Sequence, residues 1–261
     1  MKKKISIITI NYNNLEGLKR TVQSVVNQTW KEFEYIIIDG GSSDGSADYI
    51  ESQNHYFDYW VSEKDSGIYN AMNKGIKVAT GEYLLFLNSG DELYTKTVLY
   101  ENNSQIHTED LLYFDICQVF ETTTNIYNFK DKINYRTFLN GTIGHPTTFI
   151  KKELFQKYGL YDEQLKIVSD WKFFFVVVAK FNASNRKVNN ILSKFYMDGL
   201  STTNKSQVSL ERNNVLKSEF YDFVRLNDLE ILLNSLNKSR TIKFLNKLGL
   251  LEYVKNYNTL K

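Results

Sequence analysis

The segments KISIITINYNN (residues 4–14) and EYIIIDGGSSDGS (residues 34–46) decide the fold class of this chain. Each is a short β-branched run that ends in polar residues, which is the pattern of a buried strand followed by a turn. Between them, apolar residues recur at helical spacing from Leu15 to Gln28, behind Asn13 or Asn14 as the N-terminal cap. This order predicts an α/β protein with a mostly parallel central sheet flanked by helices.

The alternation of strands and helices continues to about residue 93 and then stops. A third strand is expected over Tyr59–Ser62, a helix over Ser66–Ala79 and a fourth strand over Glu82–Leu87. Further along, Leu111–Glu121 and Asn125–Phe129 are expected to pair as antiparallel strands across a Thr-rich turn. The second half is therefore not a copy of the first.

The rest of the chain is read as one helix, one strand and a polar helical tail. The helix is expected over Ser169–Phe181 and the strand near Ile191–Tyr196. These patterns predict a domain over residues 1–205, divided into a first half (1–93) and a smaller half with antiparallel strands (94–205), followed by a helical extension (206–261).

Composition excludes several classes of protein. Lys and Arg total 32 against 30 for Asp and Glu, and a net charge of +2 is too small for a nucleic-acid binder. The single cysteine, Cys117, excludes an internal disulfide and is typical of a reducing compartment. The apolar run Phe173–Ala179 is far shorter than the roughly 20 residues that span a bilayer. We therefore expect no membrane-spanning helix.

Polar residues follow three of the predicted strands directly. They form the runs Thr9 to Asn13, Asp39 to Gly45 and Asn88 to Asp91. In an open parallel sheet, ligands bind outside the carboxyl ends of the strands, so the three runs are expected to meet at one site. Each run taken alone is equally typical of turns and helix caps.

Together these runs resemble the family 2 glycosyltransferases, whose nucleotide-sugar-binding fold is called GT-A. The resemblance extends from residue 4 to about residue 201 and is most specific before residue 93. It implies that Thr9, Asn11 and Tyr12 line the pocket for the base and ribose of a nucleoside-diphosphate sugar.

Asp39 matches the acidic residue that accepts a hydrogen bond from the pyrimidine ring in this family, with Ser42 in the same donor site. A carboxylate suits that contact because it only accepts hydrogen bonds, whereas the N3–H group of uracil donates one. Asp44 is instead expected to cap the following helix.

The segment EKDSGIYNAMNKG (residues 63–75) is similar to another family segment. Asp65 and Gly67 are expected on the nucleoside side of the donor, because a Gly-containing loop lets the backbone approach a ligand. Asn70 is expected to support the site, and Lys74, one helical turn later, is read as a solvated surface charge.

Asn88, Ser89, Gly90 and Asp91 stand where the family carries its metal-binding motif. Only Asp91 is a carboxylate here, so it is the expected metal ligand in a donor site formed by all four residues. The implied cation is Mn²⁺ or Mg²⁺, which is commonly shared between one or two carboxylates and the phosphates of the substrate.

The second half carries the residues that the resemblance assigns to the acceptor side. Asp170 matches the catalytic base, although Ser169 beside it could simply cap the helix. His145 lies in a polar loop and is a catalytic candidate with an equally plausible structural role. Ser201 belongs to a segment that resembles a loop closing over the donor phosphates.

The resemblance implies an inverting enzyme that transfers one hexosyl or N-acetylhexosaminyl unit from a UDP-sugar. The Gln-x-x-Arg-Trp motif of processive synthases is absent. Relatives of this kind build bacterial polysaccharide, capsule or lipopolysaccharide, so a glycan or polyprenyl-linked acceptor at the cytoplasmic face of the plasma membrane is implied. A sugar nucleotidyltransferase and a non-catalytic nucleotide-sugar binder remain as alternatives.

The C-terminal tail has a basic amphipathic pattern. Ile242, Leu245 and Leu248 recur at helical spacing, with Arg240 and Lys243 on the other side. Such a helix can lie on an anionic membrane, or it can pack on the domain or on a second subunit in a homodimer.

Overall fold

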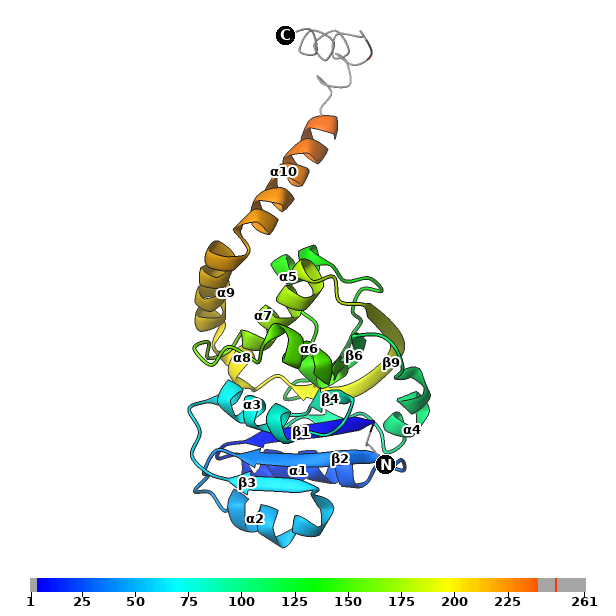
Figure 1. Cartoon of the computed structure of the whole chain (residues 1–261), viewed down its shortest axis with the longest axis vertical. Coiled ribbons are helices and arrows are strands. Elements are labelled where there is room, and N and C mark those ends of the chain that lie inside the picture. Colours follow the sequence, from blue (N-terminus) through cyan, green and yellow to red (C-terminus); the bar gives the residue numbers. More distant parts are fainter. Residues whose placement is uncertain (1–3, 239–246, 248–261) are drawn as a thin grey trace. The chain divides into compact units, whose positions relative to one another are not determined.

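The computed structural model describes residues 4–238 and Lys247 (Figure 1). These residues belong to two compact units, residues 1–212 and residues 213–261. The first unit holds the α/β domain. The first part of α9 (Lys205–Glu219) also belongs to the first unit, and the expected domain boundary after residue 205 stays a prediction.

The first half contains the predicted alternation of parallel strands and helices. Its four strands pair side by side in the order β3-β2-β1-β4, all parallel. The strands are β1 (Ile5–Asn11), β2 (Phe33–Asp39), β3 (Tyr59–Ser62) and β4 (Tyr83–Phe86). The helices between them are α1 (Leu15–Val26), α2 (Ser46–Ser52) and α3 (Ile68–Val78). Asn14 caps α1, since its side chain accepts a hydrogen bond from the amide of Gly17.

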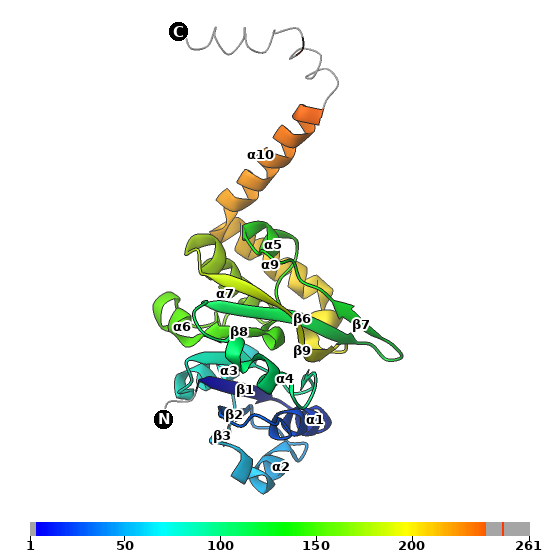
Figure 2. The same ribbon diagram turned by 90° about the vertical axis from the view of Figure 1, so that its right-hand side faces the viewer.

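The second half extends the same sheet. Among the described residues the sheet has nine strands, and β4 is followed by β8, β6, β9 and β5. The added strands are β5 (Glu92–Leu93), β6 (Leu111–Val119), β7 (Thr124–Tyr127), β8 (Thr148–Lys151) and β9 (Asn185–Tyr196). The predicted antiparallel pair is β6 with β7. Strands β5, β7 and β8 are antiparallel to the other six, so the sheet is mostly parallel. Strand β9 runs parallel to β6 (Figure 2).

Short helices connect and flank these strands. They are α4 (Val98–Asn102), α5 (Tyr135–Asn140), α6 (Lys152–Tyr158), α7 (Ser169–Phe175) and α8 (Leu200–Thr203), with 3-10 turns at Asn54–Tyr56, Asn103–Gln105 and His145–Thr147. The helix predicted over residues 169–181 is thus α7 followed by a π-helical turn, Val176–Lys180.

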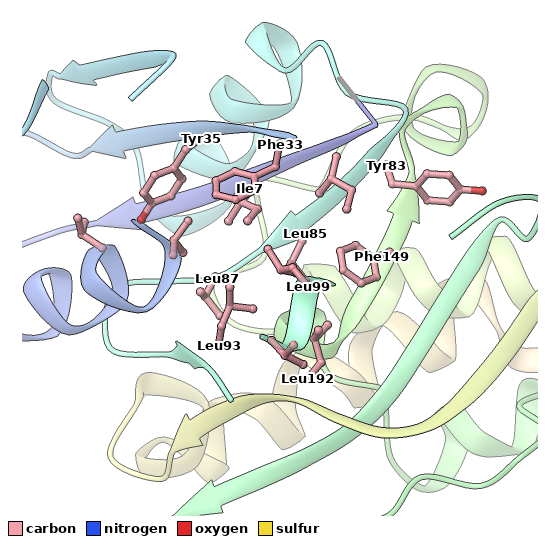
Figure 3. Packing of buried hydrophobic residues seen from close by; sticks show 14 of the residues in the cluster. Ile7, Phe33, Tyr35, Tyr83, Leu85, Leu87, Leu93, Leu99, Phe149 and Leu192 are labelled. Carbon is pink, nitrogen blue, oxygen red and sulfur yellow. The ribbon is translucent and has the colours of Figure 1, made fainter. Parts of the chain in front are cut away.

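The core of the first half follows the two-residue repeat of its strands. Ile7 lies in the hydrophobic cluster that includes Leu18 and Val22 of α1 (Figure 3). The neighbouring residue Ile8 faces α3, where a Cβ atom built on Gly75 would lie 2.5 Å from its Cγ2. Successive residues of β1 therefore contact helices on opposite faces of the sheet.

The described part of the second unit contains α10 (Tyr221–Lys238). No helix in residues 4–238 combines the length and the apolar character needed to cross a membrane. Apart from Lys247, the predicted amphipathic tail lies outside the described residues, and its membrane or subunit contact stays a prediction.

Candidate functional site

The carboxylate of Asp39 joins the ends of three strands. It accepts hydrogen bonds from Asn11 Nδ2 (2.7 Å), from the Oγ atoms of Ser42 and Ser62 (2.6 Å each) and from the amides of Ser42 (2.9 Å) and Gly41 (3.2 Å). Burial favours a higher pKa for Asp39, but these donors outweigh it and lower its pKa. The residue is 0% exposed. In this structure the carboxylate is enclosed by its hydrogen-bond donors, and its contact with a pyrimidine ring stays a prediction.

Thr9 lies in the interior as well. Its hydroxyl donates to the carbonyl of Leu87 (2.8 Å) and lies 3.2 Å from the hydroxyl of Tyr35, and the residue is fully buried. Because side chains alternate along a strand, Thr9 shares the core face of β1 with Ile7. It joins β1 to the end of β4, and its contact with the base and ribose stays a prediction.

A cavity of about 760 Å³, which we call the strand-end cavity, lies beyond the ends of β1 and β2. Its walls include Asn11, Tyr12, Gly40, Asp65 and Gly67. Tyr12 is 66% exposed, and a Cβ atom on Gly40 would lie 2.5 Å from Asp65 Oδ2. Glycine at residue 40 therefore leaves room for the Asp65 carboxylate, whose Oδ1 accepts a hydrogen bond from the amide of Gly67 (2.9 Å).

Asn70 and Ser42 do not line this cavity. Asn70 Nδ2 donates to Glu163 Oε2 (2.8 Å) on the loop before α7, so it joins α3 to the second half. Ser42 acts through Asp39 and by accepting a hydrogen bond from the amide of Asn13 (2.7 Å). Both residues support the walls of the site, and their part in donor binding stays a prediction.

The structure adds detail to the expected roles of Lys74 and Asp44. Lys74 is paired with Glu63 (2.7 Å), so it is more than a solvated charge. Asp44 accepts hydrogen bonds from the amides of Ser46 (3.1 Å) and Leu15 (2.8 Å), at the starts of α2 and α1. The N-cap position of α2 itself is Gly45, whose φ is +92°.

The turn over residues 88–91 is anchored by Thr21, which the sequence did not single out. The Thr21 hydroxyl accepts a hydrogen bond from the amide of Gly90 (2.9 Å) and donates to the carbonyl of Asp91 (2.6 Å). Gly90 has a φ of +114°, which favours glycine. A threonine on the buried face of α1 therefore sets the path of the turn.

This turn lines a second cavity of about 320 Å³, the central cavity. It shares Asn14, Ile68, Asn88, Ser89 and Gly199 with the strand-end cavity, and its own walls add Arg20, Gly90, Asp91, His145, Tyr196, Asp198 and Asp170. The two cavities are thus contiguous along residues 88–89.

Asp91 faces the central cavity and is only 6% exposed. Burial raises the pKa of Asp91 to about 7, although the charge of His145 and the amide of Tyr196 oppose the shift. Within the described residues, no cluster of three or more His, Cys, Asp or Glu side chains could hold a metal ion. Asp91 would therefore be one ligand of a cation whose other ligands come mostly from the substrate.

Arg20 is the cationic side chain of the central cavity, and its position in α1 gave no sequence signal. Its guanidinium lies 4.6 Å from the centre of the Tyr196 ring. Because α1 and β9 are distant in sequence, only the fold brings this cation beside Asp91 and Asp198.

Ser201 lies in α8, but its side chain is outside what the structure describes. Its neighbour Gly199 lines both cavities. The predicted closing role of this loop stays a prediction.

His145 and Asp170 are in direct contact. His145 Nδ1 lies 3.0 Å from Asp170 Oδ2, and His145 Nε2 lies 3.1 Å from Asn88 Nδ2. The hydroxyl of Tyr69 lies 3.0 Å from Asp170 Oδ1. Both oxygens of Asp170 are therefore oriented by a neighbour, and the two catalytic candidates form one unit.

Their charges stabilise each other. Burial alone favours a lower pKa for His145, but the hydrogen bond and charge of Asp170 raise it above its ordinary value. Burial alone favours a higher pKa for Asp170, but the hydrogen bond and charge of His145 lower it. The geometry therefore keeps Asp170 ionised and makes His145 a stronger base than a free imidazole.

A third cavity of about 340 Å³ lies on the other side of this pair, and we call it the aromatic cavity. Its walls include Gln118, Tyr127, Phe129, Thr142, Trp171, Phe195 and Arg212. His145 and Asp170 line both the central and the aromatic cavity. A carboxylate thus stands where two adjoining cavities meet.

Residues 6–159, more than half of the chain, match the model of glycosyl transferase family 2. The chain belongs to glycosyl transferase family 2. An uncharacterised glycosyltransferase of Mycobacterium tuberculosis is 34% identical to this family 2 member over 178 residues, which are 65% of this chain and 66% of that protein. The chain therefore matches just under two thirds of that relative. A PGL/p-HBAD biosynthesis glycosyltransferase of Mycobacterium bovis is 28% identical over 229 residues, covering 78% of this chain and 87% of the relative.

Solved structures confirm the GT-A fold of this family 2 glycosyltransferase. S. aureus TarS in complex with UDP superposes with a TM-score of 0.62 at 18% identity, over 82% of this chain and 72% of TarS. A mannosyltransferase from Pyrobaculum calidifontis in complex with GDP-Man and Mn²⁺ superposes with a TM-score of 0.58 at 12% identity, over 100% of this chain and 83% of that one. The predicted family and fold are both confirmed.

Proposed function

We propose that this chain transfers a single sugar from a nucleoside-diphosphate sugar to a hydroxyl group of a glycan or lipid-linked acceptor, with inversion at the anomeric carbon. The observation that carries the proposal is the position of Asp170, which lines both the central cavity and the aromatic cavity. The central cavity in turn continues into the strand-end cavity. The acceptor hydroxyl can then reach the donor sugar beside this carboxylate, with the hydroxyl and the leaving diphosphate on opposite sides of the anomeric carbon, as an in-line displacement requires.

The strand-end cavity is the proposed nucleoside site. Its volume of about 760 Å³ falls in the usual range for small-molecule pockets. Tyr12 offers an exposed ring for contact with a base, and the Asp65 carboxylate can accept an N–H hydrogen bond. Asp65 thereby takes the role that the family resemblance gave to Asp39, and it favours uracil, which carries an N3–H group, over cytosine.

The central cavity is the proposed site of the diphosphate and the donor sugar. Arg20 can pair with phosphate oxygens, and Asp91 would hold a divalent cation together with those oxygens. When bound, Mn²⁺ or Mg²⁺ would stabilise the negative charge of the leaving diphosphate. The single carboxylate fits a cation shared with substrate.

Asp170 is the proposed catalytic base. As the acceptor oxygen forms its bond to the anomeric carbon, the bond from that carbon to the diphosphate oxygen breaks, and the hydroxyl proton passes to Asp170. His145 and Tyr69 orient the two carboxylate oxygens during this step. A base that is already ionised and fixed in position needs no reorganisation before it accepts the proton.

Product analysis tests this function. The full chain is incubated with UDP-glucose, UDP-N-acetylglucosamine and GDP-mannose, with and without Mn²⁺, and nucleoside diphosphate release is followed, with NMR to assign the anomeric configuration of any product. We expect the release of nucleoside diphosphate to require Mn²⁺. If a nucleotide sugar binds but no nucleoside diphosphate is released from any donor, the chain is a non-catalytic binder. If pyrophosphate forms from a sugar phosphate and a nucleoside triphosphate, the chain is a nucleotidyltransferase.

A further inference from the structure

Arg212 is directed into the aromatic cavity by the residue before it. The carboxylate of Glu211 accepts hydrogen bonds from the amides of Lys166 (3.0 Å), Ile167 (3.0 Å) and Val168 (3.3 Å). These contacts fix the first part of α9 against the loop that leads into α7. Arg212, one position further along the helix, lines the cavity as a consequence.

The guanidinium of Arg212 has no anionic partner in the described part of the chain. It lies over the ring of Trp171, 5.0 Å from its centre, and makes no hydrogen bond or ion pair with a described residue. Its Nε atom is buried and unpartnered. Burial lowers the pKa of Arg212, and only the charge of Asp170 opposes that shift.

Arg212 is half-buried as a whole, and a more deeply buried cation in the same unit is paired. Lys187 has a side chain that is 8% exposed and lies 3.0 Å from Asp115 Oδ1. A buried charge without a partner is costly, so a polar group that faces a cavity and lacks a partner marks a place for a ligand group. Arg212 is therefore better explained as half of an ion pair that the acceptor completes.

We infer that the aromatic cavity selects an acceptor that carries an oxyanion, a carboxylate or a phosphate, and that Arg212 is the specificity-determining residue that pairs with it. This inference rests on the proposed function only in treating this cavity as the acceptor side. Tyr127 and Phe195 supply ring faces for the apolar side of a sugar. The planar guanidinium supplies bidentate recognition of the anion.

Paired probes that differ in charge test the inference without any turnover. Calorimetry on the full chain compares 4-nitrophenyl β-D-glucuronide with 4-nitrophenyl β-D-glucoside, which share the aryl group and the pyranose ring. A third probe, 4-nitrophenyl phosphate, separates phosphate from carboxylate recognition. We expect the wild type to bind at least one anionic probe about tenfold more tightly than the glucoside, a difference of about 1.4 kcal/mol.

Three variants test whether the preference for anionic probes depends on the Arg212 side chain. Arg212→Gln should remove the preference for the anion, and Arg212→Lys should keep part of it because the charge remains without the planar fork. Arg225→Gln makes the same chemical change on an exposed helix residue and should leave the preference unchanged.

The inference is overturned if the wild type binds the three probes equally, if it binds none of them at millimolar concentration, or if Arg212→Gln retains the preference. If Arg212 only supports Trp171 structurally, Arg212→Gln should lower the affinity for all three probes equally. The binding experiment contains no nucleotide sugar, so its result does not depend on turnover. If the protein transfers no sugar but still binds the anionic probe more tightly, the proposed transfer fails while this inference holds.

Discussion

His145 Nδ1 lies 3.0 Å from Asp170 Oδ2, at the wall that the central and aromatic cavities share. The pair brings together the 3-10 turn His145–Thr147 and the first turn of α7. Asp170 is oriented on its other oxygen by Tyr69 of α3, so the carboxylate is held by both halves of the domain.

Asp170→Asn should reduce sugar transfer by about 10²- to 10⁴-fold, the usual contribution of a positioned base. Asn keeps the shape and one acceptor oxygen but cannot take the proton. Nucleoside diphosphate affinity, measured by calorimetry with Mn²⁺, should stay within a few-fold of wild type, because the strand-end cavity is unchanged. A variant that keeps more than about a tenth of the wild-type rate would exclude Asp170 as the base. Glu163→Gln is the matched control, since Glu163 is exposed and bonded to Asn70 and Asn73.

The coupling between His145 and Asp170 should depend on pH in a defined window. The lowered pKa of Asp170 contributes stability that is present above the ordinary pKa of Asp and is lost as pH falls through the folded pKa. The raised pKa of His145 contributes stability that is fully present below the ordinary pKa of His and is lost as pH rises through the folded pKa. The mutual contribution is therefore greatest between about pH 4 and pH 6.5.

Urea unfolding of wild type, His145→Gln, Asp170→Asn and the double variant measures this coupling. We expect an interaction energy of about 1–3 kcal/mol near pH 5.5 and a smaller one at pH 9. An interaction energy that is equal at both pH values would show that the two side chains do not form an ion pair.

Asp91→Asn should abolish the cation dependence of donor turnover together with most of the turnover, while the protein stays folded. Asn is neutral and binds a divalent cation more weakly than a carboxylate does. Release of nucleoside diphosphate is followed with Mn²⁺ and with excess chelator. Full wild-type activity in chelator would reject a metal role for Asp91.

Asp65→Asn should narrow the preference for UDP over CDP. The carboxylate can accept the N3–H group of uracil, but it meets an unprotonated N3 in cytosine. We expect wild type to bind UDP at least about tenfold more tightly than CDP, as a charge-assisted hydrogen bond allows, and the variant to bind both with similar affinity. Asp39→Asn should instead lower stability without a base-specific effect, and the opposite result for the two variants would restore Asp39 as the base contact.

Thr21→Val should destabilise the fold by about 1–3 kcal/mol and weaken donor binding. The substitution keeps the shape but leaves the Gly90 amide and the Asp91 carbonyl without their buried partner. Thermal unfolding and UDP titration measure the two effects. Thr203→Val gives a comparison at an exposed position of α8; equal losses in the two variants would argue against an anchoring role for Thr21.

The sequence alone determined the order of elements and the family of this protein. Strand repeats of two and helix repeats of 3.6 are local properties, so the parallel strands, α1 with a cap at Asn13 or Asn14 and the β6–β7 pair could be read from residue order. The runs after the strands likewise placed Tyr12 and Asp91 near one site, because the carboxyl ends of parallel strands meet at one edge of a sheet. The resemblance to the family added Asp65 and Asp170.

Only the tertiary structure decided which polar side chains face a cavity. Thr9 lies in the same run as Tyr12, and Asp39 lies in the same run as Gly40, yet Thr9 and Asp39 are held in the interior by hydrogen bonds to neighbouring segments. Arg20, Thr21 and Arg212 occupy ordinary helix positions, and each reaches the site because a segment distant in sequence packs beside it. Side-chain direction and partner choice depend on contacts between elements, and those contacts exist only after the chain has folded.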